Sequence, residues 1–340
     1  MIKILIVDDS PVIRIALKNA LNRVDGFEVI GTASNGEEAI KENILKSPDI
    51  IIMDISMPVM DGLSAIKHIM KTKPARVLVF SGSKFFSSTE DPVYEALSVG
   101  AMDIIKKTAV IDPNSNDFEI IVDKIKEIST IDLHRGIVRK EKRLQNIERV
   151  KHDFDIITIG VSTGGPLVLK QILEKLSPDF DKTIVITQHM TKGFIKGLSD
   201  WLNSVIKVKT KIPVDGERLQ KGYIYFAPDY FHIGVRSNRI RFLDSPPINN
   251  FKPSCDVMFE EFAREYGKSL LAIILTGMGR DGTSGLKKVK EKGGYVIAQD
   301  ESTSVVYGMP KAALEAGVVD IILPANLIGE YISKYGIEVR

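Results

Sequence analysis

The sequence is poor in cysteine: Cys255 is the only one among 340 residues. An internal disulfide is therefore excluded, and we expect Cys255 to serve in packing. A single cysteine is typical of proteins kept in a reducing cytoplasm, where we place this chain. Apolar runs of the ~20 residues needed to cross a bilayer are also missing, so we predict no membrane insertion. The first strand-like run, Ile2–Val7, is followed at once by two aspartates, unlike a secretory signal.

An excess of charge of one sign is missing as well. The chain has 46 basic and 44 acidic residues, a formal net charge of +2. This balance gives no reason to expect nucleic-acid binding. Hydrophobic residues make up 44% and charged residues 26%, which is typical of a soluble globular protein. Because the length exceeds one ordinary compact core, we expect two domains.

Short apolar runs alternate with amphipathic helical patterns over residues 1–126. Ser10 before Pro11 is a favourable helix start, because serine can cap the helix and proline needs no N–H there. Such alternation predicts a parallel sheet covered by helices on both faces. The five predicted strands are Ile2–Val7, Phe27–Gly31, Ile50–Met53, Val77–Phe80 and Ile104–Ile105.

Residues 127–152 break this pattern. From residue 134 to residue 152 there are seven Lys or Arg and two Glu, so the segment cannot be buried. We predict a solvated basic linker rather than a nucleic-acid-binding arm. From residue 153 to residue 340 the alternation resumes, which predicts a second doubly wound, mostly parallel α/β domain. Three short strands within it predict a small antiparallel part: Tyr223–Phe226, Phe231–Val235 and Ile240–Leu243.

Polar side chains follow four of the predicted strands in the first domain. They are Asp8 and Asp9, Asp54, Ser81 and Lys107. Since the carboxyl ends of parallel strands meet at one edge of the sheet, we expect these side chains to converge. Clustered carboxylates suit Mg²⁺, and a carboxylate there can accept a phosphoryl group whose charge the lysine pairs and the serine hydroxyl reports.

This first domain resembles the response-regulator receiver domain over about residues 1–125. The motifs are Ile-Val-Asp-Asp-Ser, Met-Asp-Ile-Ser-Met-Pro-Val-Met-Asp-Gly, the serine after the fourth strand and Gly-Ala-Met-Asp-Ile-Ile-Lys-Lys. The resemblance implies a flavodoxin-like fold with five parallel strands.

The resemblance also assigns roles. It implies Asp54 as the phosphoacceptor, Asp8 and Asp9 as its acidic partners, and Ser81 and Lys107 as phosphate-sensing residues. Mg²⁺ would be held by Asp9 and Asp54 and by the backbone carbonyl of Ser56. One departure is Thr108, which stands where receivers usually have proline and leaves the geometry of that loop open.

A serine lies between a strand and a helix at the start of the second domain. Gly160-Val-Ser162-Thr-Gly164 fits G-x-S-x-G, a sharp turn that exposes a nucleophile. The same glycines could form a phosphate-binding turn of a nucleotide fold, although the dinucleotide pattern wants glycine in place of Ser162. Two further strand ends favour the nucleophile, because they carry His189 and Asp281 to the same edge of the sheet.

Residues 153–340 resemble the catalytic domain of the chemotaxis protein-glutamate methylesterases, the CheB family. Its motifs are Gly-Val-Ser-Thr-Gly-Gly-Pro, Thr-Gln-His-Met, Ala-Pro-Asp-Tyr-Phe-His, Lys-Pro-Ser-Cys-Asp-Val-Met-Phe, Leu-Thr-Gly-Met-Gly-Arg-Asp-Gly and Gln-Asp-Glu-Ser-Thr-Ser-Val-Val-Tyr-Gly-Met-Pro. The resemblance implies a triad of Ser162, His189 and Asp281, with the backbone of Met278 and nearby Thr163 holding the oxyanion.

The same resemblance implies substrates, cofactors and partners. The reaction would be hydrolysis of glutamate methyl esters on chemotaxis receptors, with methanol released, and deamidation of receptor glutamines. A chemotaxis histidine kinase would be the phosphodonor, Mg²⁺ would serve the receiver, and the esterase would need no cofactor. We expect the receiver to cover the esterase until Asp54 is phosphorylated. Two alternatives stay open: a receiver-controlled binding module without catalysis, and a nucleotide-binding domain.

Overall fold

The computed structural model describes residues 1–82, 92–107, 111–131 and 154–335. The chain divides into two compact units, Met1–His134 and Arg135–Arg340. The basic segment 132–153 and Thr108 lie outside the described residues, so the predictions made for them stay predictions. No described helix is both long enough and apolar enough to cross a membrane.

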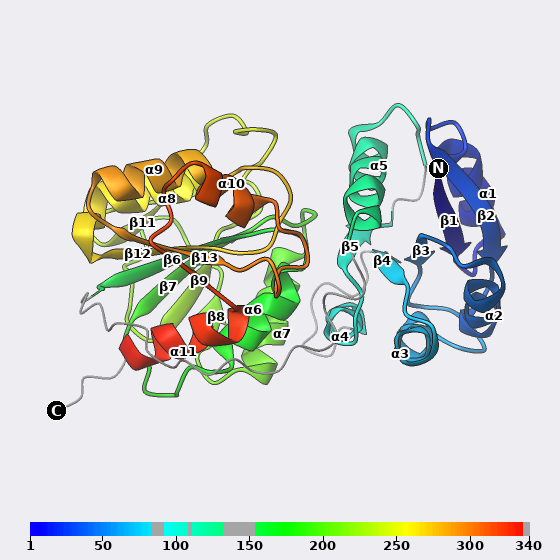
Figure 1. Cartoon of the computed structure of the whole chain (residues 1–340), viewed down its shortest axis with the longest axis horizontal. Helices are drawn as coiled ribbons and strands as arrows, with labels where there is room; N and C mark the ends of the chain where they lie inside the picture. Colours follow the sequence, from blue (N-terminus) through cyan, green and yellow to red (C-terminus); the bar gives the residue numbers. More distant parts are fainter. Residues whose placement is uncertain (83–91, 108–110, 132–153, 336–340) are drawn as a thin grey trace. The chain divides into compact units, whose positions relative to one another are not determined.

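The first unit is a five-stranded sheet in the order β2-β1-β3-β4-β5, with every neighbouring pair parallel. The predicted flavodoxin-like fold is therefore confirmed. In Figure 1, α1 and α5 lie on one side of this sheet and α2, α3 and α4 on the other. The strands are β1 (Ile2–Val7), β2 (Phe27–Ala33), β3 (Ile50–Met53), β4 (Arg76–Ser81) and β5 (Asp103–Lys106).

Side-chain caps fix where several of these helices begin. The Ser10 side chain accepts from the N–H of Ile13 at the start of α1, as its place before Pro11 predicts. Asn35 and Asp61 cap the next two helices in the same way. The helix that closes the unit ends at Ser129, three residues beyond the boundary expected at 126. The helices are α1 (Pro11–Leu21), α2 (Gly36–Lys46), α3 (Gly62–Thr72), α4 (Pro92–Ser98) and α5 (Asn116–Ser129).

The second unit contains a seven-stranded sheet in the order β14-β13-β12-β6-β7-β9-β8. Its first strand, β6, lies in the middle with β7 on one side and β12 on the other, so the strand order reverses at β6. In an open α/β sheet this is where ligands bind, beyond the carboxyl ends of the strands. The strands are β6 (Ile156–Val161), β7 (Thr183–Gln188), β8 (Lys209–Lys211), β9 (Tyr223–Phe226), β12 (Leu270–Ile274), β13 (Tyr295–Gln299) and β14 (Ile321–Leu323).

One prediction about this sheet is wrong. Tyr223–Phe226 was expected in the antiparallel part, but it is β9 and pairs parallel with β7 and β8. A run of four residues carries no signal of strand direction, because direction is set by the crossover that precedes it. The small antiparallel part is confirmed for the other two strands, β10 (His232–Arg236) and β11 (Arg239–Leu243).

Helices cover both faces of the second sheet. In Figure 1, α8, α9 and α10 lie on one side and α6, α7 and α11 on the other. Because the sheet is enclosed, β6, β7 and β12 are buried along their whole length. The helices are α6 (Gly165–Leu173), α7 (Ile195–Val205), α8 (Cys255–Tyr266), α9 (Thr283–Glu291), α10 (Met309–Glu315) and α11 (Ala325–Tyr335), with a 3₁₀ turn at Gly267–Ser269.

Candidate active site

Ser162 follows directly after the central strand β6. Its N–H donates to the Thr276 carbonyl at 2.9 Å, and its carbonyl accepts from the Gly165 N–H at 2.9 Å to close a tight turn into α6. Gly164 in that turn has a φ of +77°, and a Cβ there would lie 2.5 Å from Val305. Only glycine fits this position, so the turn that places Ser162 at the end of the strand depends on it.

His189 occupies the matching position on the neighbouring strand. The parallel register pairs Val161 with Gln188, so Ser162 and His189 are the next residues on adjacent strands. The His189 N–H donates to the Val161 carbonyl at 2.9 Å. Phe251 stacks on the imidazole, with ring centroids 3.9 Å apart and planes within 5°. The ring is thus held by its own strand end and by an aromatic face.

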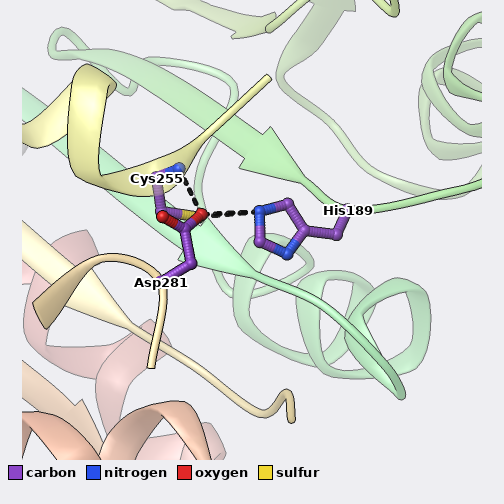
Figure 2. A group of neighbouring side chains, drawn as sticks. All are labelled: His189, Cys255 and Asp281. Atoms are coloured by element: carbon purple, nitrogen blue, oxygen red, sulfur yellow. Dashed lines mark hydrogen bonds and ion pairs between the residues drawn. The ribbon is translucent and has the colours of Figure 1, made fainter. Parts of the chain in front are cut away.

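Asp281 is the carboxylate partner of His189. Its Oδ2 lies 2.8 Å from His189 Nε2 and accepts the Cys255 N–H at 2.7 Å, as Figure 2 shows. Its Oδ1 accepts the Ser254 hydroxyl at 2.7 Å. Burial by itself raises the pKa of the Asp281 carboxyl, but the hydrogen bonds from His189, Ser254 and Cys255 outweigh it and hold the pKa below its usual value. Asp281 is therefore an ionised, fully satisfied acceptor.

This contact decides which imidazole nitrogen is free. An ionised Asp281 accepts a hydrogen from Nε2, so in the neutral ring the lone pair is on Nδ1. Nδ1 is buried and makes no hydrogen bond. Nδ1 is therefore the imidazole atom that is left free to accept a proton.

The loop after β12 lies against Ser162. A Cβ on Gly277 would lie 2.6 Å from the Ser162 Cβ, so only glycine allows the two segments to approach. The next residue, Met278, is half exposed, and its N–H donates to no described residue. Thr163 is buried beside Ser162, and its carbonyl accepts the Thr276 hydroxyl at 2.9 Å. An unused N–H next to the serine is what an oxyanion site requires.

Sequence reasoning missed two residues of this site. Ser254 starts α8 as its N-cap while also binding Asp281. A serine before a helical pattern is a cap signal, but its cross-helix contact has no local signature. Phe251 closes a tight turn in which Asn249 and Asn250 have φ values of +50° and +68°. The Asn-Asn pair could have predicted this turn, though not the stacking on His189.

Cys255 touches the same cluster. Its Sγ lies 3.6 Å from His189 Nε2. Burial raises the pKa of the Cys255 thiol well above its usual value, and the charges of Asp281 and Asp256 add to this. A thiol held in its protonated form does not act as a nucleophile. The predicted packing role agrees with its complete burial.

The residues predicted at the receiver edge also converge. Lys107 Nζ lies 2.6 Å from an Asp54 carboxylate oxygen and 2.7 Å from an Asp8 oxygen. Oxygens of Asp8, Asp9 and Asp54 all lie within 4.8 Å of one another, with Asp8 and Asp54 buried and Asp9 exposed. A cluster of this kind provides the hard oxygen ligands that fit Mg²⁺.

The charge state of this edge follows from burial. Burial raises the pKa of the Asp54 carboxyl, and the hydrogen bond from Lys107 only partly opposes this. Burial alone would lower the pKa of the Lys107 ammonium, but Asp54 and Asp8 outweigh it and raise that pKa. Ser81 ends β4, and its carbonyl accepts the Lys107 N–H at 2.7 Å. Ser56 is exposed, two residues after Asp54.

Comparison with known proteins identifies the family. A family model described as CheB methylesterase matches residues 157–332. The protein-glutamate methylesterase/protein-glutamine glutaminase of Methanococcoides burtonii is 39% identical over 350 residues, covering 100% of this chain and 99% of that protein. The chain belongs to the CheB methylesterase family. A relative of the same name from Thermotoga maritima is 38% identical and covers 97% of each chain.

Both halves of the chain agree with this family. A response regulator receiver domain model matches residues 4–113. The crystal structure of the Thermotoga maritima CheB methylesterase catalytic domain aligns with a TM-score of 0.51 at 42% identity, covering 53% of this chain and 98% of that one. The methylesterase interpretation is confirmed over a receiver-controlled binding module without catalysis. A receiver domain generally implies Mg²⁺-dependent phosphorylation and a kinase that supplies the phosphoryl group.

Proposed function

We propose that Ser162, His189 and Asp281 of this chain hydrolyse methyl esters of glutamate side chains on chemotaxis receptors. The observation that carries the proposal is the His189–Asp281 pair beside Ser162, with the free Nδ1 atom as base. The same acyl attack on a receptor glutamine would release ammonia instead of methanol. The names of the two curated relatives, which include both activities, support this extension.

The reaction begins when His189 Nδ1 takes the Ser162 hydroxyl proton as Oγ attacks the ester carbonyl carbon. Asp281 stabilises the protonated ring through Nε2. The carbonyl oxygen becomes an oxyanion that accepts the Met278 N–H, a contact whose loss typically costs about 3 kcal/mol of barrier. Thr163, which is buried beside Ser162, would help to hold the oxyanion. Methanol leaves with the proton from His189, and an acyl-serine remains.

Water completes the cycle by the same groups. It loses a proton to His189 Nδ1 while its oxygen attacks the acyl-serine carbonyl carbon. The bond to Oγ breaks, Ser162 regains its proton from His189, and the free glutamate side chain departs. Each proton that His189 takes is returned within the same half-reaction, so the enzyme ends as it began.

We propose that phosphorylation of Asp54 controls the esterase activity. Mg²⁺ would be held by the Asp9 and Asp54 carboxylates and the Ser56 carbonyl, where it would neutralise charge on an incoming phosphoryl group. Once Asp54 is modified, the ion pair with Lys107 must re-form on a phosphate oxygen. Ser81, at the end of the adjacent strand, can then donate its hydroxyl to the same group. Asp8 completes the acidic edge. A chemotaxis histidine kinase is the proposed phosphodonor.

Methanol release from methylated receptor membranes tests the proposal. We expect release by the wild type, stimulation by a small phosphodonor, and no release by Ser162→Ala. Ser204→Ala, on the exposed side of α7, is the matched control and should behave as wild type. Asp54→Asn should hydrolyse without responding to the phosphodonor. Full activity in Ser162→Ala would refute the triad, and nucleotide binding without ester hydrolysis would support the nucleotide-binding alternative.

A further inference from the structure

Two helices begin beside the triad, and a carboxylate at the start of each one accepts backbone N–H groups from the start of the other. Helix α8 begins at Cys255 and helix α9 at Thr283, and their backbones approach closely: a Cβ on Gly285 would lie 2.7 Å from the Phe259 Cβ. Asp281, just before α9, accepts N–H groups from the first turn of α8. Asp256, in the first turn of α8, accepts the Gly285 N–H at 2.8 Å. Each helix thus provides the acceptor for the other.

Helix α9 depends on this exchange more than α8 does. Its own N-cap is Gly282, which has no side chain to accept a hydrogen bond. The carboxylate of Asp256 satisfies the first turn instead, with the N–H groups of Gly282 and Ser284 joining that of Gly285. Gly282 is the residue next to Asp281. By accepting these N–H groups, Asp256 therefore fixes the backbone from which the Asp281 side chain projects.

Asp256 is also close to Asp281 itself. The Asp256 N–H donates to Asp281 Oδ1 at 3.2 Å, and the Ser254 hydroxyl is within 3.1 Å of the same N–H. In the part of the chain that the structure describes, Asp256 makes no hydrogen bond with His189 or Ser162, so it acts on them through Asp281. The carboxylates of Asp256 and Asp281 also interact by charge, since the charge of Asp281 raises the pKa of Asp256.

We propose that Asp256 is a positioning residue for the Ser162–His189–Asp281 triad: it holds the first turn of α9, keeps Asp281 in register with His189 Nε2, and adds negative charge behind it. The inference rests on the proposed hydrolase function. It concerns how the triad is kept in place, and Asp256 does not touch the reacting atoms.

Folding disfavours the ionised form of the Asp256 carboxyl. Burial raises its pKa to about 6, and the charge of Asp281 adds to this, although the N–H groups of α9 oppose it. The titratable groups that face it are Asp281 from the loop before α9 and Cys255 on its own helix, with His189 beyond Asp281. Because a raised pKa means that folding disfavours the charge, removing the charge offsets part of the cost of losing an acceptor oxygen, and Asp256→Asn should change the melting temperature little.

Full-length Asp256→Asn separates positioning from stability. We expect kcat for methanol release to fall about tenfold to a hundredfold with KM unchanged, as for a small misplacement of a catalytic group. The acid limb of the pH profile of kcat should lose the step that protonation of Asp256 contributes near pH 6. The melting temperature should change little. Asp256→Ala, which also removes the acceptor, should lose more activity.

The matched control is Asp320→Asn. Asp320 also accepts a backbone N–H, from Val296 at 2.7 Å, but at the opposite end of the sheet from the triad. It should keep wild-type kcat and pH profile. Wild-type kcat and an unchanged acid limb in Asp256→Asn would overturn the inference while leaving the hydrolase function standing. A kcat loss that only follows a loss of melting temperature would also overturn it. Absence of methanol release by the wild type would instead refute the proposed function.

Discussion

Replacing Asp281 by asparagine tests the triad at its most constrained contact. The carboxylate accepts four hydrogen bonds, two on each oxygen, whereas an amide offers one acceptor oxygen and one NH₂ group. If NH₂ replaced Oδ2 it would face the Cys255 N–H, which lies at 2.7 Å. If NH₂ replaced Oδ1 it would face the weaker Asp256 N–H contact of 3.2 Å, and the Ser254 hydroxyl could rotate to accept from it. The second orientation is therefore favoured.

This orientation sets the size of the effect. The amide oxygen still accepts from His189 Nε2, so Nδ1 keeps its lone pair and the base is the correct atom. What is lost is the negative charge next to the protonated ring. Opposite charges about 4 Å apart interact by about 4 kcal/mol at an effective dielectric constant near 20. A barrier raised by about 4 kcal/mol lowers kcat about 1,000-fold.

Methanol release measured in single turnovers gives the rate constant of this step directly. The double variant Ser254→Ala with Asp281→Asn removes the hydroxyl that selects the amide orientation. Its ring can then adopt the other tautomer, with hydrogen on Nδ1, so we expect activity to fall further than in Asp281→Asn alone. A loss of less than tenfold in Asp281→Asn would refute the charge argument. Equal activity in the single and double variants would refute the orientation argument.

Three further perturbations probe the two sites. Phe251→Ala removes the stacked ring from His189; since an aromatic pair contributes about 1 kcal/mol, we expect kcat to fall about fivefold and Phe251→Tyr to restore it in the methanol assay. Gly277→Ala forces the loop away from Ser162 and should lower kcat at least about 100-fold, as expected for a displaced nucleophile. Lys107→Met removes the group that opposes the raised pKa of Asp54. The ionised carboxylate is the phosphoacceptor. As the pH is lowered, phosphorylation of that variant by a small phosphodonor should therefore begin to fall at a higher pH than phosphorylation of the wild type does.

The positions of both sites could be predicted from the sequence because they depend on strand ends. A buried apolar run fixes a strand, and parallel strands bring their carboxyl ends to one edge, so Asp54, Ser162, His189 and Asp281 could be placed without coordinates. The choice between Nδ1 and Nε2 could not, because the ring orientation is set by Asp281 and Phe251, which come from segments distant in the sequence. The role of Phe251 was missed for the same reason. These contacts join segments about 60 to 90 residues apart, beyond the reach of periodicity or capping patterns.

The free Nδ1 atom of His189 has a consequence for the shape of substrates. Nδ1 is bonded to Cγ, so it lies nearer to the main chain than Nε2 does. The departing alcohol must collect its proton there, close to the ends of β6 and β7 and under the ring of Phe251. Because the Phe251 ring covers one face of the imidazole, we expect esters of alcohols bulkier than methanol to be hydrolysed more slowly than methyl esters.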